Sequence, residues 1–303
     1  MRADVIMDNM IIPVDVADTY EQRRKVIHVS MLRLDLVHPV ISGNKIFKLH
    51  YFLEDAVNSD HKQLITFGGA YSNHLAATAF ACKAAGVRSL AFIRGEKPDK
   101  LSHTLALCMK HGMHLEFISR KLYKTIHEKG FLEQVSKQFG EHVLVPEGGF
   151  SKKGAKGAEL IYNYFDQNQY TQICCAIGTG TTFAGLINAK EKTEIIGFVA
   201  LKNLDDINER LETLGVSGAT KYTLMKGYHF NGYAKKNSQL ITFMNSFYQS
   251  TKIPLDFVYT GKMMFGVYDL IEKNYFPPGS NVLCIHTGGL QGNESLPKQM
   301  LNF

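Results

Sequence analysis

The sequence lacks several features that define particular protein classes. No apolar run is long enough to span a membrane, and the first thirty residues mix four aspartates among the apolar ones, so we expect neither a membrane span nor a secretory signal. Low-complexity segments and internal repeats are also absent, so no solenoid or repeat array is indicated.

Metal-binding and disulfide patterns are missing as well. The cysteines have no CxxC spacing and lie in apolar runs, so we predict reduced, buried thiols in a cytoplasmic protein. They are Cys82, Cys108, Cys174, Cys175 and Cys284. The net charge is +6, but no basic stripe with interleaved aromatics supports nucleic-acid binding. Attraction of anionic small molecules is the milder inference.

Two nucleotide-binding signatures are absent from the loop Gly178–Gly185. No Gly-Lys-Ser/Thr follows at Walker spacing, and Gly185 comes two positions late for a GxGxxG loop. The loop still has glycines for close backbone approach and the hydroxyls of Thr179, Thr181 and Thr182 at a predicted helix start, which together can cradle a phosphate. A plain strand–turn–helix and a nucleotide-binding module stay open as alternatives.

What is present is an alternation of apolar strands and amphipathic helices from about residue 60 onward. The predicted strands are Gln63–Phe67, Ser89–Ile93, His114–Ile118, His142–Val145, Ile173–Ile177, Glu194–Leu201 and Val282–His286. The predicted helices are Asn73–Ala85, Leu101–His111, Lys124–Gln138, Ala155–Phe165, Ile207–Leu214, Ser238–Ser250 and Lys262–Asn274. Continuous apolar strands separated by helices predict an α/β fold with parallel sheet covered on both faces. Residues 1–42 are predicted to be irregular, with strand-like pieces such as Val26–Val29.

Two lysines at a predicted helix start are the first candidates for chemistry. In Ser42–Leu49 the turn Gly43-Asn44 precedes Lys45, and Lys48 follows at i+3 on the same face. The positive end of the helix dipole lowers the pKa of an amine, and only a neutral amine attacks a carbonyl. The alternative is a pair of surface lysines.

Ligands in open α/β sheets bind beyond the carboxyl ends of the strands, which directs attention to three further segments. Ser72 or Asn73 can cap the helix after Gly68-Gly69 or help to bind a carboxylate or phosphate. Tyr259, in Leu255–Lys262, is either an active phenol or a core residue. His286 is either a base or a buried histidine bonded to a carbonyl, and with no ligand partner at metal spacing we predict no catalytic metal.

Six segments in a fixed order resemble one family. They are Gly43-Asn44-Lys45-x-x-Lys48-Leu49, Gly69-x-x-Ser72-Asn73-His74, Pro146-Glu147-Gly148-Gly149, Gly178–Gly185, Val258-Tyr259-Thr260-Gly261-Lys262 and His286-Thr287-Gly288-Gly289. The chain resembles the 1-aminocyclopropane-1-carboxylate deaminase / D-cysteine desulfhydrase family of pyridoxal phosphate (PLP) enzymes, which have the tryptophan-synthase-β-like fold, fold type II. The resemblance implies a homodimer, with PLP between a larger domain (1–47 and 156–303) and a smaller one (48–155).

The resemblance also implies roles for single residues. Lys45 would form the Schiff base, and Ser72, Tyr233 and Tyr259 would act on the substrate. Ser72 would meet the substrate carboxylate or act near the reacting carbon. The cofactor-binding residues would be Lys45, Lys48, Asn73, Gly178, Thr179, Gly180, Thr181, Thr182, Thr260 and Thr287. Lys48 and the glycine loop would hold the phosphate, Asn73 would face the ring and its 3′-hydroxyl, and Thr260 would approach the pyridine nitrogen.

Several positions depart from the family pattern. Thr260 stands where the deaminases proper carry glutamate, and a neutral hydroxyl makes the ring a weaker electron sink. Tyr71 replaces a glutamine, Ser42 a glycine and Phe47 a basic residue, while Leu290-Gln291-Gly292 is unlike the characterised members. The departure at Thr260 favours loss of a thiolate over opening of a cyclopropane.

We therefore expect a PLP-dependent lyase or deaminase that acts on a small amino acid, most simply D-cysteine, giving pyruvate, ammonia and sulfide. After the substrate amine displaces it, the Lys45 amine would remove the α-proton. The alternatives are 1-aminocyclopropane-1-carboxylate deaminase activity and a PLP-binding protein without this catalysis. The stereochemistry of the substrate stays open.

Overall fold

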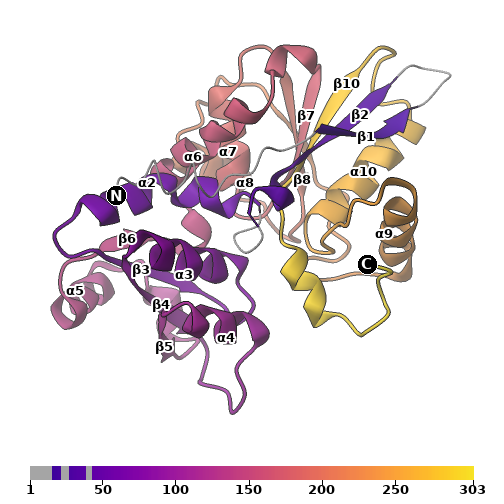
Figure 1. Ribbon diagram of the computed structural model, residues 1–303. Helices are drawn as coiled ribbons and strands as arrows, with labels where there is room; N and C mark the ends of the chain where they lie inside the picture. The colour runs from indigo at the N-terminus through magenta and orange to yellow at the C-terminus, as the bar shows by residue number, and fades with distance from the viewer. Residues whose placement is uncertain (1–15, 22–26, 39–42) are drawn as a thin grey trace.

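The protein folds around two β-sheets (Figure 1). The computed structural model describes residues 16–21, 27–38 and 43–303, so Ser42 lies outside the described residues. The larger sheet has the strand order β1-β2-β10-β7-β8-β9 and the smaller sheet the order β5-β4-β3-β6. In Figure 1 the smaller sheet and its helices lie at the lower left, and the larger sheet lies at the upper right.

The larger sheet is parallel except at one edge, where β1 pairs antiparallel with β2. Its strands are β1 (Val16–Glu21), β2 (His28–Arg33), β7 (Gln172–Ile177), β8 (Glu194–Val199), β9 (Thr223–Met225) and β10 (Asn281–His286). Successive residues of β7 face opposite clusters: Ile173 and Cys175 belong to one apolar core, and Cys174 and Ala176 to another. Burial on both faces explains why this strand is apolar throughout rather than alternating.

The smaller sheet is entirely parallel. Its strands are β3 (Gln63–Gly68), β4 (Arg88–Arg94), β5 (His114–Ile118) and β6 (Val143–Val145). On one face Ile65 and Phe67 pack in a cluster with Val135 of helix α5 (Lys129–Phe139). On the other face Ala91 and Ile93 pack with Leu75 of helix α3 (Asn73–Ala85). The α/β class and the parallel sheets are therefore confirmed.

The helices follow the predicted alternation, and the predicted Asn73–Ala85, Ser238–Ser250 and Lys262–Asn274 match to within two residues. The predicted helix Lys124–Gln138 begins only at Lys129, and the predicted Ala155–Phe165 is an α-helix to Glu159 and a 3-10 helix beyond it. The α-helices are α2 (Lys45–Asn58), α3 (Asn73–Ala85), α4 (His103–Lys110), α5 (Lys129–Phe139), α6 (Lys152–Glu159), α7 (Thr181–Ala189), α8 (Ile207–Thr213), α9 (Ser238–Thr251) and α10 (Thr260–Glu272). Short 3-10 helices are η1 (Leu34–Leu36), η2 (Leu122–Thr125), η3 (Glu147–Gly149), η4 (Leu160–Tyr164), η5 (Gln167–Gln169) and η6 (Leu290–Ser295).

Two sequence predictions need correction. The segment predicted to be irregular supplies two strands, and β2 joins the interior of the larger sheet by pairing with both β1 and β10. The segment Leu255–Lys262 is not the end of a strand, because residues 252–256 form an irregular loop and α10 begins at Thr260. The carboxylate of Asp256 accepts from three backbone N–H groups there and stabilises a turn.

The predicted domain ranges can be compared with the sheets. Every strand of the smaller sheet lies within 48–155, and every strand of the larger sheet lies outside it. Each predicted boundary nevertheless falls inside a helix, one in α2 and one in α6, and these two helices pack against each other. The exact division stays a prediction.

Two composition-based predictions can also be compared with the structure. All five cysteines are free and buried, as predicted. None of the helices in the described ranges combines the length and low polarity that crossing a bilayer requires.

Candidate active site

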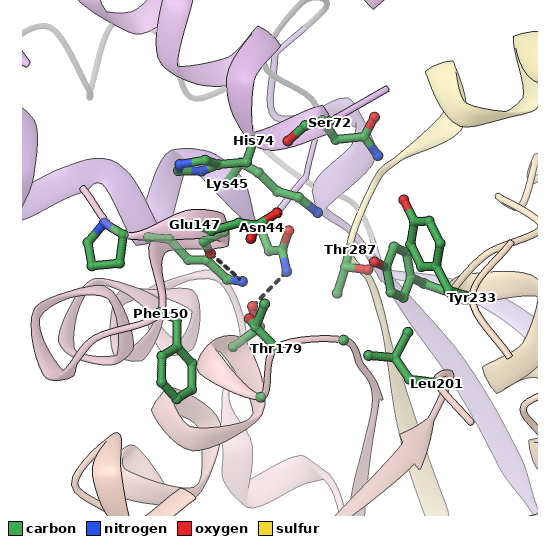
Figure 2. A pocket seen from close by; sticks show the side chains of 18 of the residues that line it. Asn44, Lys45, Ser72, His74, Glu147, Phe150, Thr179, Leu201, Tyr233 and Thr287 are labelled. Atoms are coloured by element: carbon green, nitrogen blue, oxygen red, sulfur yellow. Dashed lines mark hydrogen bonds between the residues drawn. The ribbon is translucent and has the colours of Figure 1, made fainter. Parts of the chain in front are cut away.

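A cavity of about 650 Å³ lies where the carboxyl ends of strands from both sheets meet (Figure 2). Gly69 follows β3, Pro146 follows β6, Gly178 follows β7 and Thr287 follows β10, and all four line it. Eleven of the predicted site residues also line it: Lys45, Lys48, Ser72, Asn73, Gly178, Thr179, Gly180, Thr182, Tyr233, Tyr259 and Thr287. The chain folds these distant segments into one site.

The start of helix α2 is fixed against the end of β10. The N–H of Asn44 donates to the carbonyl of Thr287 at 3.2 Å. Gly43 has φ +86°, and a Cβ at this position would collide with the same Thr287 carbonyl. Glycine is required there for both reasons. The helix then begins at Lys45, as predicted. Nζ of Lys45 lies 6.0 Å from the centre of the Tyr259 ring.

Both lysines of α2 have lowered pKa values. Burial lowers the pKa of Lys45 to about 8, and the carboxylate of Asp256 opposes this shift. Burial and the positive charge of Lys45 lower the pKa of Lys48 to about 7, and Lys48 Nζ donates to the carbonyl of Gly148 at 3.3 Å. The lowered pKa predicted for Lys45 is therefore present, but removal from water is its largest cause rather than the helix dipole.

The glycine loop after β7 opens helix α7 and faces the two lysines. Gly180 caps that helix with φ +91° and has no side chain to bond the first free N–H groups. The amide of Asn44 donates to Thr182 Oγ1 at 2.6 Å, and Thr179 Oγ1 lies 3.0 Å from Thr181 Oγ1. Thr181 is fully buried and is not among the lining residues. Free N–H groups, hydroxyls and a nearby ammonium suit a phosphate.

Helix α3 presents its first residues to the cavity. Ser72 is its N-cap, as predicted, and its hydroxyl accepts from the N–H of Leu75 at 3.4 Å. Asn73 follows, and its Oδ1 is buried without a hydrogen-bond partner among the described residues. A buried acceptor left unpaired costs about 1–3 kcal/mol, so a ligand donor at this point would be stabilising.

His74 is a cavity residue to which sequence reasoning gave no role. The Thr66 hydroxyl donates to Val145 O at 2.9 Å, so it accepts from His74 Nε2, also at 2.9 Å. This leaves Nδ1 as a bare acceptor, buried and unpaired within the described residues. Burial, with the charges of Lys48 and Lys45, lowers the pKa of His74 to about 3. The only sequence signal was its place directly after Ser72-Asn73.

The two predicted phenols lie together opposite α2. The rings of Tyr233 and Tyr259 are 6.4 Å apart between centres. Burial raises the pKa of Tyr259 above its usual range, with smaller contributions from Tyr233, Asp256 and Glu147. Tyr259 therefore stays protonated at neutral pH. Tyr233 is 55% exposed, and Figure 2 shows it beside Thr287 and Leu201.

A buried carboxylate behind Tyr259 was also missed. Asp256 accepts from the N–H groups of Val258, Tyr259 and Thr260 at 2.8–2.9 Å and from the Thr260 hydroxyl at 2.7 Å. Thr260 itself is fully buried and is not among the lining residues. The available signal was an aspartate four residues before a threonine at a helix entrance.

His286 is a buried histidine bonded to a carbonyl, the second of the two alternatives given above. It is fully buried, its Nε2 donates to the carbonyl of Pro254 at 2.7 Å, and its Nδ1 accepts from the N–H of Gly288 at 3.2 Å. Both ring nitrogens are therefore occupied, and the histidine holds the loop after β10. Among the described residues no three His, Cys, Asp or Glu side chains are grouped closely enough to hold a metal ion.

The cavity mouth carries an ion pair that the sequence analysis did not single out. Arg94 follows the apolar run of β4, Glu147 follows β6, and their charged groups are 4.0 Å apart. Both line the cavity and both are partly exposed. Charged residues at the ends of β4 and β6, the two parallel strands that flank β3, were the signal available.

The lining residues fit pyridoxal phosphate. The start of α7 and Lys48 suit its phosphate, and the Lys45 amine suits its aldehyde. The unpaired Oδ1 of Asn73 can accept a hydrogen bond from the 3′-hydroxyl. Gly178 keeps the floor open, because a Cβ there would come within 2.9 Å of the Tyr259 ring.

Comparisons with known proteins agree with this geometry. A family described as pyridoxal-phosphate dependent enzyme matches residues 23–288. A protein of Thermotoga maritima named as a putative 1-aminocyclopropane-1-carboxylate deaminase is 32% identical over 286 residues, covering 88% of this chain and 89% of its own. D-cysteine desulfhydrase of Yersinia enterocolitica is 27% identical, with 85% of each chain covered.

Solved structures give the same result. The crystal structure of a homologue of 1-aminocyclopropane-1-carboxylate (ACC) deaminase matches with a TM-score of 0.76 and 26% identity over 96% of both chains. A threonine deaminase isoform of Solanum lycopersicum matches with a TM-score of 0.64 at 16% identity, which concerns the fold alone. The chain therefore belongs to the 1-aminocyclopropane-1-carboxylate deaminase / D-cysteine desulfhydrase family of pyridoxal-phosphate-dependent enzymes, with fold type II.

Proposed function

We propose that the protein catalyses β-elimination and deamination of a small amino acid, with D-cysteine as the model substrate. The observation that carries this proposal is the pairing of a base and an acid across the cavity. Lys45 has a pKa lowered to about 8, and the Tyr259 phenol, which stays protonated at neutral pH, lies beside it with 6.0 Å between Nζ and the ring centre. Elimination needs a base at the α-carbon and an acid at the leaving group.

Each of these residues has a defined task in the proposed reaction. Bound pyridoxal phosphate supplies the electron withdrawal that acidifies the α-proton of the substrate. The neutral amine of Lys45 accepts that proton. The protonated phenol of Tyr259 would give a proton to the departing thiolate, and Tyr233 lies next to Tyr259 at the mouth.

The start of α3 is the proposed site for the substrate carboxylate. Ser72 and Asn73 line the cavity at the N-terminus of a 13-residue helix, where free N–H groups and the helix dipole favour an anion. The N–H of Ser72 donates to Gly69 O at 3.1 Å, and this hydrogen bond holds the turn that leads into the helix.

The choice of elimination over ring opening depends on the acids around the cavity. Glu147 is the only carboxylate among the lining residues that the structure describes, and it faces Arg94 at the mouth. Asp256 lies behind the wall with its oxygens bonded to Val258, Tyr259 and Thr260. With no acid among the described residues of the cavity floor to keep the ring nitrogen charged, expulsion of a good leaving group is easier than opening a cyclopropane.

The test is a panel of D- and L-amino acids assayed for ammonia, 2-oxo acid and sulfide release. The proposal expects D-cysteine to give pyruvate, ammonia and sulfide, with turnover well above that of 1-aminocyclopropane-1-carboxylate. Faster turnover of the cyclopropane would support the alternative, deaminase activity. A borohydride-sensitive absorbance band with no product from any amino acid would reduce the protein to a binder of pyridoxal phosphate and overturn the proposal.

A further inference from the structure

The turn that carries Tyr233 has a backbone conformation that a short segment does not hold unaided. Phe230, Asn231 and Ala234 have φ values of 50°, 68° and 52°, and Gly232 has φ 118°. Sparsely populated conformations of this kind cost about 1–3 kcal/mol per residue other than glycine, so neighbouring structure has to hold them. The half-exposed ring of Tyr233 supplies little of that support.

The support comes from one buried ammonium group. Nζ of Lys262 donates to the carbonyl oxygens of Ala200, His229 and Gly232 at 3.2, 2.9 and 2.7 Å. These contacts use all three of its N–H bonds, and the residue is only 1% exposed. Three carbonyl dipoles thus replace the water that the ammonium loses on burial.

The two carbonyls from the turn also take part in backbone hydrogen bonds. His229 O accepts from the N–H of Gly232 at 2.9 Å, and Gly232 O accepts from the N–H of Lys235 at 3.1 Å. Because a carbonyl has two lone pairs, Lys262 takes the second acceptor position of each. It therefore fastens two consecutive turns, 229–232 and 232–235, and the second contains Tyr233.

Lys262 also shares a helix start with the other phenol. It is the third residue of α10, and Tyr259 is the cap of the same helix, while Ala200 directly follows β8. We propose that Lys262 is a positioning residue that fixes the Tyr233 phenol relative to the Tyr259 phenol. This inference rests on the proposed function, in which Tyr259 is the acid and Tyr233 lies next to it at the mouth of the cavity.

Hydrogen exchange of the cofactor-loaded protein tests the clamp without any assay of activity. Lys262→Met keeps the length of the side chain but removes its charge and donors. Lys235→Met makes the same change at an exposed lysine of the same turn and serves as the control. We expect the amides of 226–236 to exchange at least about tenfold faster in the Lys262 variant only. Unchanged protection would overturn the proposal. If Lys262→Met does not fold, Lys262→Gln, which keeps two N–H donors, is measured instead.

A kinetic cycle then tests the positioning of Tyr233. We expect Lys262→Met to lower kcat/KM for elimination by about tenfold, because displaced catalytic groups lose orientation. In a Tyr233→Phe background the same change should cost almost nothing, since the group that it positions is already gone. Losses that multiply in the double variant would overturn the inference.

The two failures are distinguishable. Lys262→Met should retain the borohydride-sensitive absorbance band, because Lys45 is intact. If the unaltered protein converts no amino acid, the proposed function fails, and the exchange measurement still decides whether Lys262 holds the turn.

Discussion

The two walls of the cavity differ in how far the protein itself satisfies their polar groups. We call 229–235 with 256–262 the phenol wall, and the starts of α2 and α3 (43–48 and 72–74) the amide wall. In the phenol wall Asp256 accepts from four donors and Lys262 donates to three acceptors. The amide wall has three buried acceptors without partners among the described residues: Asn44 Oδ1, Asn73 Oδ1 and His74 Nδ1.

This difference suits the two walls to different functions. A wall whose buried charged groups have hydrogen-bond partners within the protein is held in one conformation, which suits residues that must meet a reacting atom in one geometry. A wall with unpaired acceptors is stabilised by a ligand that brings donors, which suits a cofactor-binding surface. Substitutions in the two walls should therefore have different effects on catalysis, cofactor binding and stability.

The largest expected effect is at the two lysines of the amide wall. Lys45→Ala should remove the borohydride-sensitive band and lower the elimination rate by about 10³-fold or more, because the covalent attachment point and the base are lost together. Lys48→Ala should keep the band and weaken pyridoxal phosphate binding by about 10–100-fold, the loss of one charged hydrogen bond. Absorbance titrations measure both. Loss of the band in both variants would show that the division of roles is wrong.

In the phenol wall, Tyr259→Phe removes one proton donor and little else. We expect kcat to fall by about 10²-fold with cofactor affinity unchanged. Tyr228→Phe is the matched control, because its hydroxyl donates to Asp269 at 2.6 Å and it is not a lining residue. Steady-state kinetics with D-cysteine give the comparison, and an equal fall in both variants would contradict a role for Tyr259 in proton transfer.

The free energy of unfolding should depend more on the phenol wall than on the amide wall. Asp256→Asn weakens charge-assisted hydrogen bonds inside the phenol wall, so we expect the free energy of unfolding to drop by about 3 kcal/mol. Asn73→Ala removes an unpaired acceptor, so the cofactor-free protein should change by less than about 1 kcal/mol while its affinity for pyridoxal phosphate falls. Urea unfolding of the cofactor-free variants measures the first quantity. A larger loss for Asn73→Ala than for Asp256→Asn would invert the comparison.

The smallest effect is on pH dependence. With a pKa of about 8, Lys45 is about one-tenth neutral at pH 7 and about nine-tenths neutral at pH 9, so reaction with an aldehyde should speed up about tenfold over that range. Pyridoxal, which lacks the phosphate, is the probe, because Lys48 with its pKa of about 7 loses charge over the same range. A rate that rises about a hundredfold between pH 7 and pH 9 would place the pKa of Lys45 near its ordinary value, because the neutral fraction of such an amine grows tenfold with each pH unit.

The sequence predicted most of the fold because its signals were local. Apolar runs such as Gln63–Phe67 and caps such as Ser72 depend on neighbours in the chain, and the structure has both. β2 was not predicted as part of a sheet interior, because that position depends on pairing with β10, some 250 residues away.

The site residues also differ in whether local sequence or tertiary packing determines their roles. Lys45 was found because it stands at a helix start in a recognisable order of motifs. The main cause of its lowered pKa, burial, depends on packing that brings α2 against the ends of both sheets. Asp256, His74 and Lys262 were not assigned roles from the sequence. Their roles depend on tertiary contacts that the neighbouring sequence does not indicate, such as those with Ala200 and Thr66.

Gly43 has a consequence for how this protein can be altered by selection. Its φ of +86° and the adjacent carbonyl of Thr287 leave no volume for a side chain. In a library randomised at this codon, we expect glycine alone among the active clones. The neighbouring lysines, by contrast, can be replaced without such a collision, so a loss of activity there would report on their chemical roles. Gly43, at the junction between α2 and β10, thus tolerates no substitution even though it has no side chain to contact a substrate.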